Sequence, residues 1–286
     1  MTPFRRRNRL DRTRISRGRN QPNLDSQDDN FDSADFEVEG LELQKPRARN
    51  KGIYLLPNAF TTAALFCGFF AIVQAMNHQF EAAAIAIFAS LVLDGMDGRI
   101  ARMTNTQSAF GEQYDSLADM VSFGVAPALV AYEWVLKDFG KWGWLAAFTY
   151  CAGAALRLAR FNANNGVVDK KFFQGLPSPA AGALIAGFIW LADDNQLPVR
   201  DSAIPWVTFL ITIYAGLTMV SNARFYSGKA LDIRYRVPFG VMVLMILTFV
   251  LISSNPPLTL FGIFVIYAIS GYVIWGWERF SGRKLT

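Results

Sequence analysis

A series of long apolar runs begins at Ile53 and continues almost to the end of the 286-residue chain. Most of these runs approach the roughly 20 residues that a helix needs to cross a hydrocarbon layer about 30 Å thick. The runs are too long for barrel strands, so helices are the expected way to satisfy the backbone in lipid. The sequence therefore predicts an all-α, polytopic membrane bundle of about eight transmembrane helices, with six as the alternative count. The expected spans are 53–76, 80–103, 112–136, 142–161, 179–192, 203–222, 238–254 and 258–278.

The basic residues that follow the N-terminal tail are divided unequally between the two sides of such a bundle. An even number of spans places both termini on one side, which we take as the cytoplasm. Thirteen bases then lie at inner ends or in inner loops, against three in outer loops. This asymmetry is the one expected from the positive-inside rule. The inner bases are Arg99, Arg102, Arg157, Arg160, Lys170, Lys171, Arg224, Lys229, Arg234, Arg236, Arg279, Arg283 and Lys284, and the outer ones are Lys137, Lys141 and Arg200.

The N-terminal tail separates its charges into two blocks. Eight arginines precede residue 20, and eight acidic residues lie between residues 25 and 42 with no base among them. Such a segment has too little apolar surface to fold alone, so residues 1–50 are expected to form a disordered cytoplasmic tail. The arginines could bind anionic lipid head groups or only set the topology. With 52% hydrophobic residues, a net charge of +5 and two cysteines, the chain is expected to be neither a nucleic-acid binder nor a disulfide scaffold.

Four aspartates lie where the second and third spans meet the cytoplasmic side. Asp94 and Asp97 are three residues apart, so they share one face of a helix. Asp115 and Asp119 are four residues apart on the next helix and also share a face. Because the connection between the two spans is short, we expect antiparallel neighbours whose four carboxylates converge.

Converging carboxylates at a membrane edge need a positive partner, because like charges in a poor solvent repel one another. Hard divalent cations such as Mg²⁺ bind carboxylate oxygens together with phosphate, and one carboxylate can then act as a general base in phosphoryl transfer. Gly98 and Gly111 leave room for a ligand, and Arg102 is a candidate phosphate clamp. The purely structural alternative is ion pairing of the aspartates with Arg99, Arg102, Arg157 and Arg160.

The aspartates belong to a longer pattern. Residues 94–102 read Asp-Gly-Met-Asp-Gly-Arg-Ile-Ala-Arg, and Gly111, Asp115 and Asp119 follow at fixed intervals. This pattern resembles the signature of the CDP-alcohol phosphotransferase family at every fixed position. The resemblance implies a six-helix core that usually dimerises, a CDP-linked donor and a dependence on Mg²⁺ or Mn²⁺.

The same resemblance assigns roles to individual residues. It implies that Asp94, Asp97 and Asp115 bind metal, and that Asp119 deprotonates the acceptor hydroxyl and can contact a second metal. The segment Pro57–Thr61 resembles a further family element that faces the nucleotide. The implied CDP-diacylglycerol-binding residues are Asn58, Thr61, Gly98, Arg102 and Ser108.

Three further segments resemble the serine-using branch of this family, namely Arg157–Asn162, Phe173–Gly182 and Leu217–Phe225. They imply transfer of the phosphatidyl group from CDP-diacylglycerol to the hydroxyl of L-serine, with release of CMP. Serine carries a carboxylate that an arginine can bind with two hydrogen bonds. The same arginines could instead anchor a helix at the membrane surface. The candidate serine-binding residues are Arg157, Arg160, Asn162, Ser178 and Arg224.

We therefore expect a tail over residues 1–50, a CDP-alcohol phosphotransferase core over 51–230, and two additional transmembrane helices with a short basic tail over 231–286. The protein is expected to be a homodimer in a bacterial or archaeal plasma membrane, with its active site facing the cytoplasm. The sequence leaves two alternatives. One keeps the chemistry but uses glycerol 3-phosphate, inositol phosphate or choline as acceptor. The other is an ion-coupled transporter that uses intramembrane acids.

Overall fold

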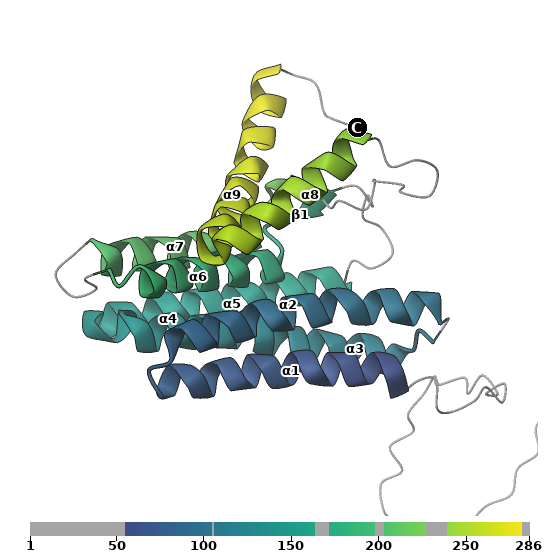
Figure 1. Cartoon of the computed structure of the whole chain (residues 1–286), viewed down its shortest axis with the longest axis horizontal. Helices are drawn as coiled ribbons and strands as arrows, with labels where there is room; N and C mark the ends of the chain where they lie inside the picture. The colour runs from purple at the N-terminus through teal and green to yellow at the C-terminus, as the bar shows by residue number, and fades with distance from the viewer. Residues whose placement is uncertain (1–54, 105, 164–171, 198–202, 227–238, 282–286) are drawn as a thin grey trace, which may run out of the picture. The chain divides into compact units, whose positions relative to one another are not determined.

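A computed structural model describes residues 55–104, 106–163, 172–197, 203–226 and 239–281 (Figure 1). These residues are mostly helical, which confirms the all-α class. Their helical segments coincide with the eight predicted spans, and each boundary lies within three residues of the expected one. The predicted tail over residues 1–50 lies outside the described residues. The helices are α1 (Leu55–Met76), α2 (Phe80–Met103), α3 (Ala109–Asp119), α4 (Ala126–Trp134), α5 (Lys141–Ala163), α6 (Ser178–Asp194), α7 (Ile204–Val220), α8 (Phe239–Ser254) and α9 (Pro256–Ser281).

The third predicted span is not a uniform helix. A π-helical turn over Met120–Val125 joins α3 to α4, so Asp119 is the last residue before the helix widens. Single π turns of this kind occur frequently at functional sites. A short 3₁₀ turn over Leu136–Phe139 then leads into α5.

Two short strands were not predicted from the sequence. Strand β1 (Phe172–Gln174) pairs antiparallel with β2 (Arg224–Tyr226), and Phe173 lies opposite Phe225. The pair joins the chain before α6 to the chain after α7. We call these two strands the β1–β2 ribbon.

Small residues allow the helices to approach closely. A methyl group added at Gly153 of α5 would lie 2.4 Å from the carbonyl oxygen of Gly216 in α7, so these two backbones are in contact. Close helix contact through glycine and alanine is typical of membrane bundles, where burial against lipid supplies no hydrophobic driving force. Figure 1 shows α1 beside α2, and α1 packs against α3 as well.

A polar contact ties three elements together next to the aspartates. The hydroxyls of Ser90 in α2 and Ser122 in the π turn both donate to the carbonyl oxygen of Ala64 in α1, at 2.9 and 3.1 Å. Gly68, one turn along α1, leaves room for Ser122, since an added Cβ would lie 2.6 Å from its hydroxyl oxygen. These contacts set the position of the chain directly after Asp119.

Two of the described helices are long and apolar enough to cross a membrane, over Leu56–Met76 and Pro256–Trp277. The helices Ile204–Val220 and Phe239–Ser254 are apolar but shorter. Large apolar side chains also cover much of the outer surface, and α8 has no buried residue. An apolar surface of this extent suits contact with lipid or another protein better than contact with water. That eight helices cross the membrane stays a prediction.

Candidate active site

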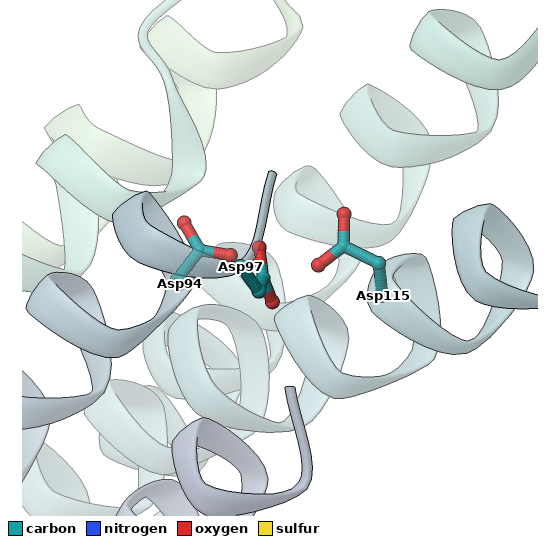
Figure 2. Close-up of side chains that lie close together, drawn as sticks. All are labelled: Asp94, Asp97 and Asp115. Carbon is teal, nitrogen blue, oxygen red and sulfur yellow. The ribbon is translucent and has the colours of Figure 1, made fainter. Parts of the chain in front are cut away.

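Three of the four aspartates meet between α2 and α3, as predicted. Asp94, Asp97 and Asp115 each offer a carboxylate oxygen, and these oxygens all lie within 4.8 Å of one another. Figure 2 shows Asp94 and Asp97 on α2 with Asp115 approaching from the facing helix. Helix α1 packs against both α2 and α3, so three helices hold the carboxylates in place.

Asp97 is oriented by α1. The buried hydroxyl of Thr61 donates a hydrogen bond of 2.8 Å to the Oδ2 atom of Asp97. The same hydroxyl lies 3.2 Å from the carbonyl oxygen of Pro57 in its own helix. Thr61 therefore holds one carboxylate oxygen and leaves the other oxygen of Asp97 for a ligand.

Asp119 lies one turn beyond Asp115, at the C-terminal end of α3. Its carboxyl group interacts electrostatically with those of Asp94 and Asp115 and with the guanidinium of Arg157. The Oδ1 atoms of Asp115 and Asp119 are buried and accept no hydrogen bond from any described residue. A buried carboxylate oxygen without a partner is costly, so both oxygens are suited to a bound cation.

The ion-pairing alternative finds no support in the described part of the chain. None of the four aspartates forms an ion pair within 4.0 Å with a described arginine. The candidate ligands are carboxylate oxygens, which Mg²⁺ and Mn²⁺ prefer. The residues present therefore fit a hard divalent cation.

A cavity of about 600 Å³ opens beside the cluster, and all five predicted CDP-diacylglycerol-binding residues line it. A Cβ added at Gly98 would meet nothing within 4 Å, so this face of α2 is open to a ligand. Sequence reasoning missed three polar lining residues: Thr106, Gln107 and Glu112. These three residues lie between Asp97 and Asp115 in the sequence, and this position could have indicated that they are close to the site.

Two of the cavity residues also have structural partners. Ser108 caps the N-terminus of α3 by accepting a hydrogen bond of 3.0 Å from the backbone N–H of Gly111. The Nε atom of Arg102 donates to the carbonyl oxygen of Gly98 at 2.9 Å. This bond fixes the guanidinium along the cavity wall. The two terminal nitrogens of Arg102 form no hydrogen bond with a described residue, so they are available to a ligand in the cavity.

Two of the five predicted serine-binding residues contact each other, and one of them interacts with Asp119. The Nη1 atom of Arg157 donates a hydrogen bond of 2.8 Å to the hydroxyl of Ser178, which is fully buried at the start of α6. The Nε atom of Arg157 is buried and has no hydrogen-bond partner among the described residues. Arg157 also interacts electrostatically with Asp119. Arg157 and Asp119 therefore each keep one buried polar atom without a hydrogen-bond partner among the described residues, within electrostatic range of each other.

The other three predicted serine-binding residues have different surroundings. The side-chain amide of Asn162 donates a hydrogen bond of 3.1 Å to the hydroxyl of Ser116, the residue after Asp115. Arg160 donates to the carbonyl oxygens of Val220 and Ser221 and to the side chain of Asn222, which satisfies the C-terminal end of α7. Arg224 lies in β2 opposite Gln174. Any contact of these residues with an acceptor stays a prediction.

The geometry is that of a helical bundle with an acidic cluster that could hold a cation beside a cavity. The family model of the CDP-alcohol phosphatidyltransferases matches residues 54–216, which is more than half of the chain. The chain therefore belongs to the CDP-alcohol phosphatidyltransferase family, and the expected family membership is confirmed.

Three individual relatives indicate which members of the family the chain is similar to. The chain is 37% identical over 218 residues to a CDP-diacylglycerol–serine O-phosphatidyltransferase of Helicobacter pylori, covering 76% of this chain and 90% of the relative. It is 33% identical over 189 residues to the enzyme of that name from Methanocaldococcus jannaschii, covering 65% and 82%. It is 41% identical over 157 residues to the one from Mycobacterium bovis, covering 52% and 54%.

Proposed function

We propose that this protein is a phosphatidylserine synthase, which transfers the phosphatidyl group of CDP-diacylglycerol to L-serine and releases CMP. The observation that carries the proposal is the interaction of Asp119 with Arg157, whose guanidinium Ser178 holds. One place thus offers a proton acceptor for a hydroxyl and a cation for a carboxylate, which are the two groups that serine presents together. The names of the curated relatives support the same reaction.

The metal centre would consist of Asp94, Asp97 and Asp115, with Asp119 available to a second ion. Bound Mg²⁺ or Mn²⁺ would stabilise negative charge on the phosphates and on the departing CMP. Thr61 prepares the centre by holding Asp97 through its hydroxyl. Within the described residues, the Oδ1 atom of Asp115 has no hydrogen-bond partner, so it is the oxygen that would gain most from the cation.

Asp119 would act as the general base. Its Oδ1 atom accepts no hydrogen bond within the described residues, so it can accept the proton of the serine hydroxyl. The serine oxygen then forms a bond to the β-phosphorus of CDP-diacylglycerol, and the bond from that phosphorus to the oxygen of CMP breaks. Arg157 interacts electrostatically with Asp119, so a carboxylate bound by this guanidinium would bring its hydroxyl close to the base.

The cavity would hold the CDP part of the donor. Arg102 presents its guanidinium to the phosphates, and Gly98 allows them to approach α2 closely. Asn58 and Ser108 lie on the other walls and offer polar groups to the nucleotide. The acyl chains would stay in lipid, because the helices around the cavity carry apolar outer surfaces.

The acceptor would be held on the α5 and α6 side. The Arg157 guanidinium, kept in place by Ser178, would bind the serine carboxylate. Asn162 reaches the same side of α3 through Ser116 and is the next candidate for contact with the acceptor. Arg160 and Arg224 would complete the basic surroundings from the end of α7 and from β2.

We also propose a topology in which eight helices cross a bacterial or archaeal plasma membrane as a homodimer. Both termini and the active site would face the cytoplasm. The excess of inner over outer basic residues supports this orientation. Serine would then enter from the water, while the lipid donor would enter from the inner leaflet.

The test is a product assay on the full-length protein in detergent micelles with CDP-diacylglycerol, serine and Mn²⁺ or Mg²⁺. We expect equal amounts of phosphatidylserine and CMP, and neither product without the metal. Glycerol 3-phosphate, inositol phosphate and choline are offered in parallel reactions. Faster CMP release with one of these than with serine would refute serine as the acceptor, and no CMP release with any of them would refute the enzyme assignment.

A further inference from the structure

Helix α9 lies outside the segment that matches the family model, which ends at residue 216. It nevertheless packs against α6 and against β2. A Cβ at Gly187 of α6 would lie 3.2 Å from the Cα atom of Phe261, so α9 sits close to the α6 backbone. The C-terminal hairpin is therefore attached to the core through α9 and not through α8, whose described side chains are all at least partly exposed.

Tyr267 of α9 holds the β1–β2 ribbon. Its hydroxyl donates a hydrogen bond of 3.1 Å to the carbonyl oxygen of Tyr226 in β2. Its ring packs on the buried ring of Phe225, with the two ring centres 5.7 Å apart. One turn further along α9, Gly271 leaves room for the same ring, because an added Cβ would lie 2.4 Å from it.

The ribbon in turn sets the start of α6. The backbone N–H of Gly175 donates to the carbonyl oxygen of Ala223 at 2.9 Å, and that of Leu176 donates to the carbonyl oxygen of Thr218 at 3.2 Å. Gly175 has a φ of +78°, and a Cβ there would lie 2.2 Å from the carbonyl oxygen of Met219. The turn after β1 is thus tightly determined, and Ser178 follows it directly.

Ser178 is the only hydrogen-bond partner of the Arg157 guanidinium within the described residues. Tyr267 also lies close enough to Arg157 for an electrostatic interaction. The position of Arg157 therefore depends on Ser178, on the ribbon before Ser178, and on the α9 tyrosine that braces the ribbon.

We propose that α9 belongs to the acceptor site, and that Tyr267 is a positioning residue which orients Arg157 toward Asp119 by bracing the β1–β2 ribbon. The inference rests on the proposed function only in naming serine as the ligand of Arg157. Loss of the brace loosens the acceptor side and leaves the donor cavity, which is lined by residues of α1, α2, α3 and the loop before α3, unchanged.

The experiment compares Tyr267→Phe with Tyr214→Phe in the full-length protein. The Tyr214 hydroxyl donates to the carbonyl oxygen of Ala268 at 2.8 Å, so the control also removes one tyrosine bond to α9 but does not touch the ribbon. We expect Tyr267→Phe to raise the KM for serine about threefold to tenfold, the range that one net hydrogen bond supplies. The KM for CDP-diacylglycerol should stay within about twofold of the wild-type value, and Tyr214→Phe should change neither KM.

A second pair of variants covers the case in which Tyr267→Phe folds poorly. Gly271→Ala places a methyl group against the Phe225 ring, whereas Gly262→Ala on the same helix adds one in open space. The first should raise the serine KM and the second should not. An unchanged serine KM in both Tyr267→Phe and Gly271→Ala would overturn the proposal, as would an equal rise of both substrate KM values.

Failure of the proposed function has a different signature. If the proposed function is wrong, the wild-type protein prefers another acceptor. The KM for that acceptor is then measured in the same four variants instead of the serine KM. A rise of this KM in Tyr267→Phe and Gly271→Ala supports the role of Tyr267, and an unchanged KM refutes it. The two outcomes are therefore separable in one set of measurements.

Discussion

Replacing Thr61 with valine tests whether α1 prepares the metal centre. Valine has nearly the shape of threonine but cannot donate the hydrogen bond of 2.8 Å that holds Oδ2 of Asp97. Groups that orient metal ligands typically contribute about 10-fold to 100-fold to metal affinity. At about 1.4 kcal/mol per tenfold this is about 1.4 to 2.8 kcal/mol, which agrees with about 1.5 to 3 kcal/mol for a hydrogen bond to a charged group.

The assay is CMP release at saturating CDP-diacylglycerol and serine over a series of Mn²⁺ concentrations. We expect Thr61→Val to raise the Mn²⁺ concentration at half-maximal activity about 10-fold to 100-fold, while the rate at saturating Mn²⁺ stays near the wild-type rate. Thr62→Val is the matched control. Thr62 is the next residue of α1, is exposed, and its hydroxyl contacts the hydroxyl of Tyr114 at 2.9 Å and the carbonyl oxygen of Asn58 at 2.7 Å, but no described aspartate.

Two results would refute this reasoning. The first is a half-maximal Mn²⁺ concentration in Thr61→Val within about twofold of the wild-type value, which is less than one oriented hydrogen bond should give. The second is an equal shift in Thr62→Val, which would make the effect a general property of α1. A rise in the KM for CDP-diacylglycerol without a metal shift would instead place the Thr61 hydroxyl on the nucleotide.

Three further predictions concern the same site. Asp119→Asn should lower kcat at least about 100-fold, since it removes the proton acceptor, yet retain CDP-diacylglycerol binding in a spin-labelled or radiolabelled lipid assay; near-normal turnover would exclude Asp119 as the base. Gly98→Ala should raise the KM for CDP-diacylglycerol without lowering Tm, because the added methyl group projects into open space at the cavity. Gly95→Ala, which also meets open space but does not line the cavity, should leave that KM unchanged. Removal of divalent cations with EDTA should abolish CMP release, and Mn²⁺ or Mg²⁺ should restore it; activity that persists in EDTA would contradict the metal centre.

The helices could be placed from the sequence because their signal is local. The apolar runs end at charged residues, glycines or prolines, and the backbone in such runs has few alternatives to a helix. The convergence of Asp94, Asp97 and Asp115 was also predictable, because spacings of three and four residues on two successive helices define which side chains share a face. These inferences needed only the spacing within each helix and the short connection between the second and third spans.

The β1–β2 ribbon and the π turn could not be predicted in the same way. Each strand has three residues, too few for an alternating pattern, and its partner lies about fifty residues away in the chain. The π turn depends on Ser122 reaching across to Ala64 while Gly68 makes room. Both features follow from contacts between distant segments, which no local pattern encodes.

The two arginines of α5 also show a difference that the sequence could not predict and the tertiary structure decides. The sequence treated Arg157 and Arg160 as equivalent, because residues three apart share a helix face. In the folded chain Arg157 reaches Ser178 and Asp119, whereas Arg160 reaches the end of α7. The difference comes from what lies beside each guanidinium, and a long, flexible side chain takes the partner that its neighbours offer.

The sequence alone therefore determined the helical class, the positions of the helices and the four aspartates with their spacing, because each of these depends on residues within one or two turns. The tertiary structure decided which arginine faces Asp119, how Thr61 holds Asp97, and that α9 braces the ribbon in front of Ser178. These depend on side chains that meet only after the helices have packed.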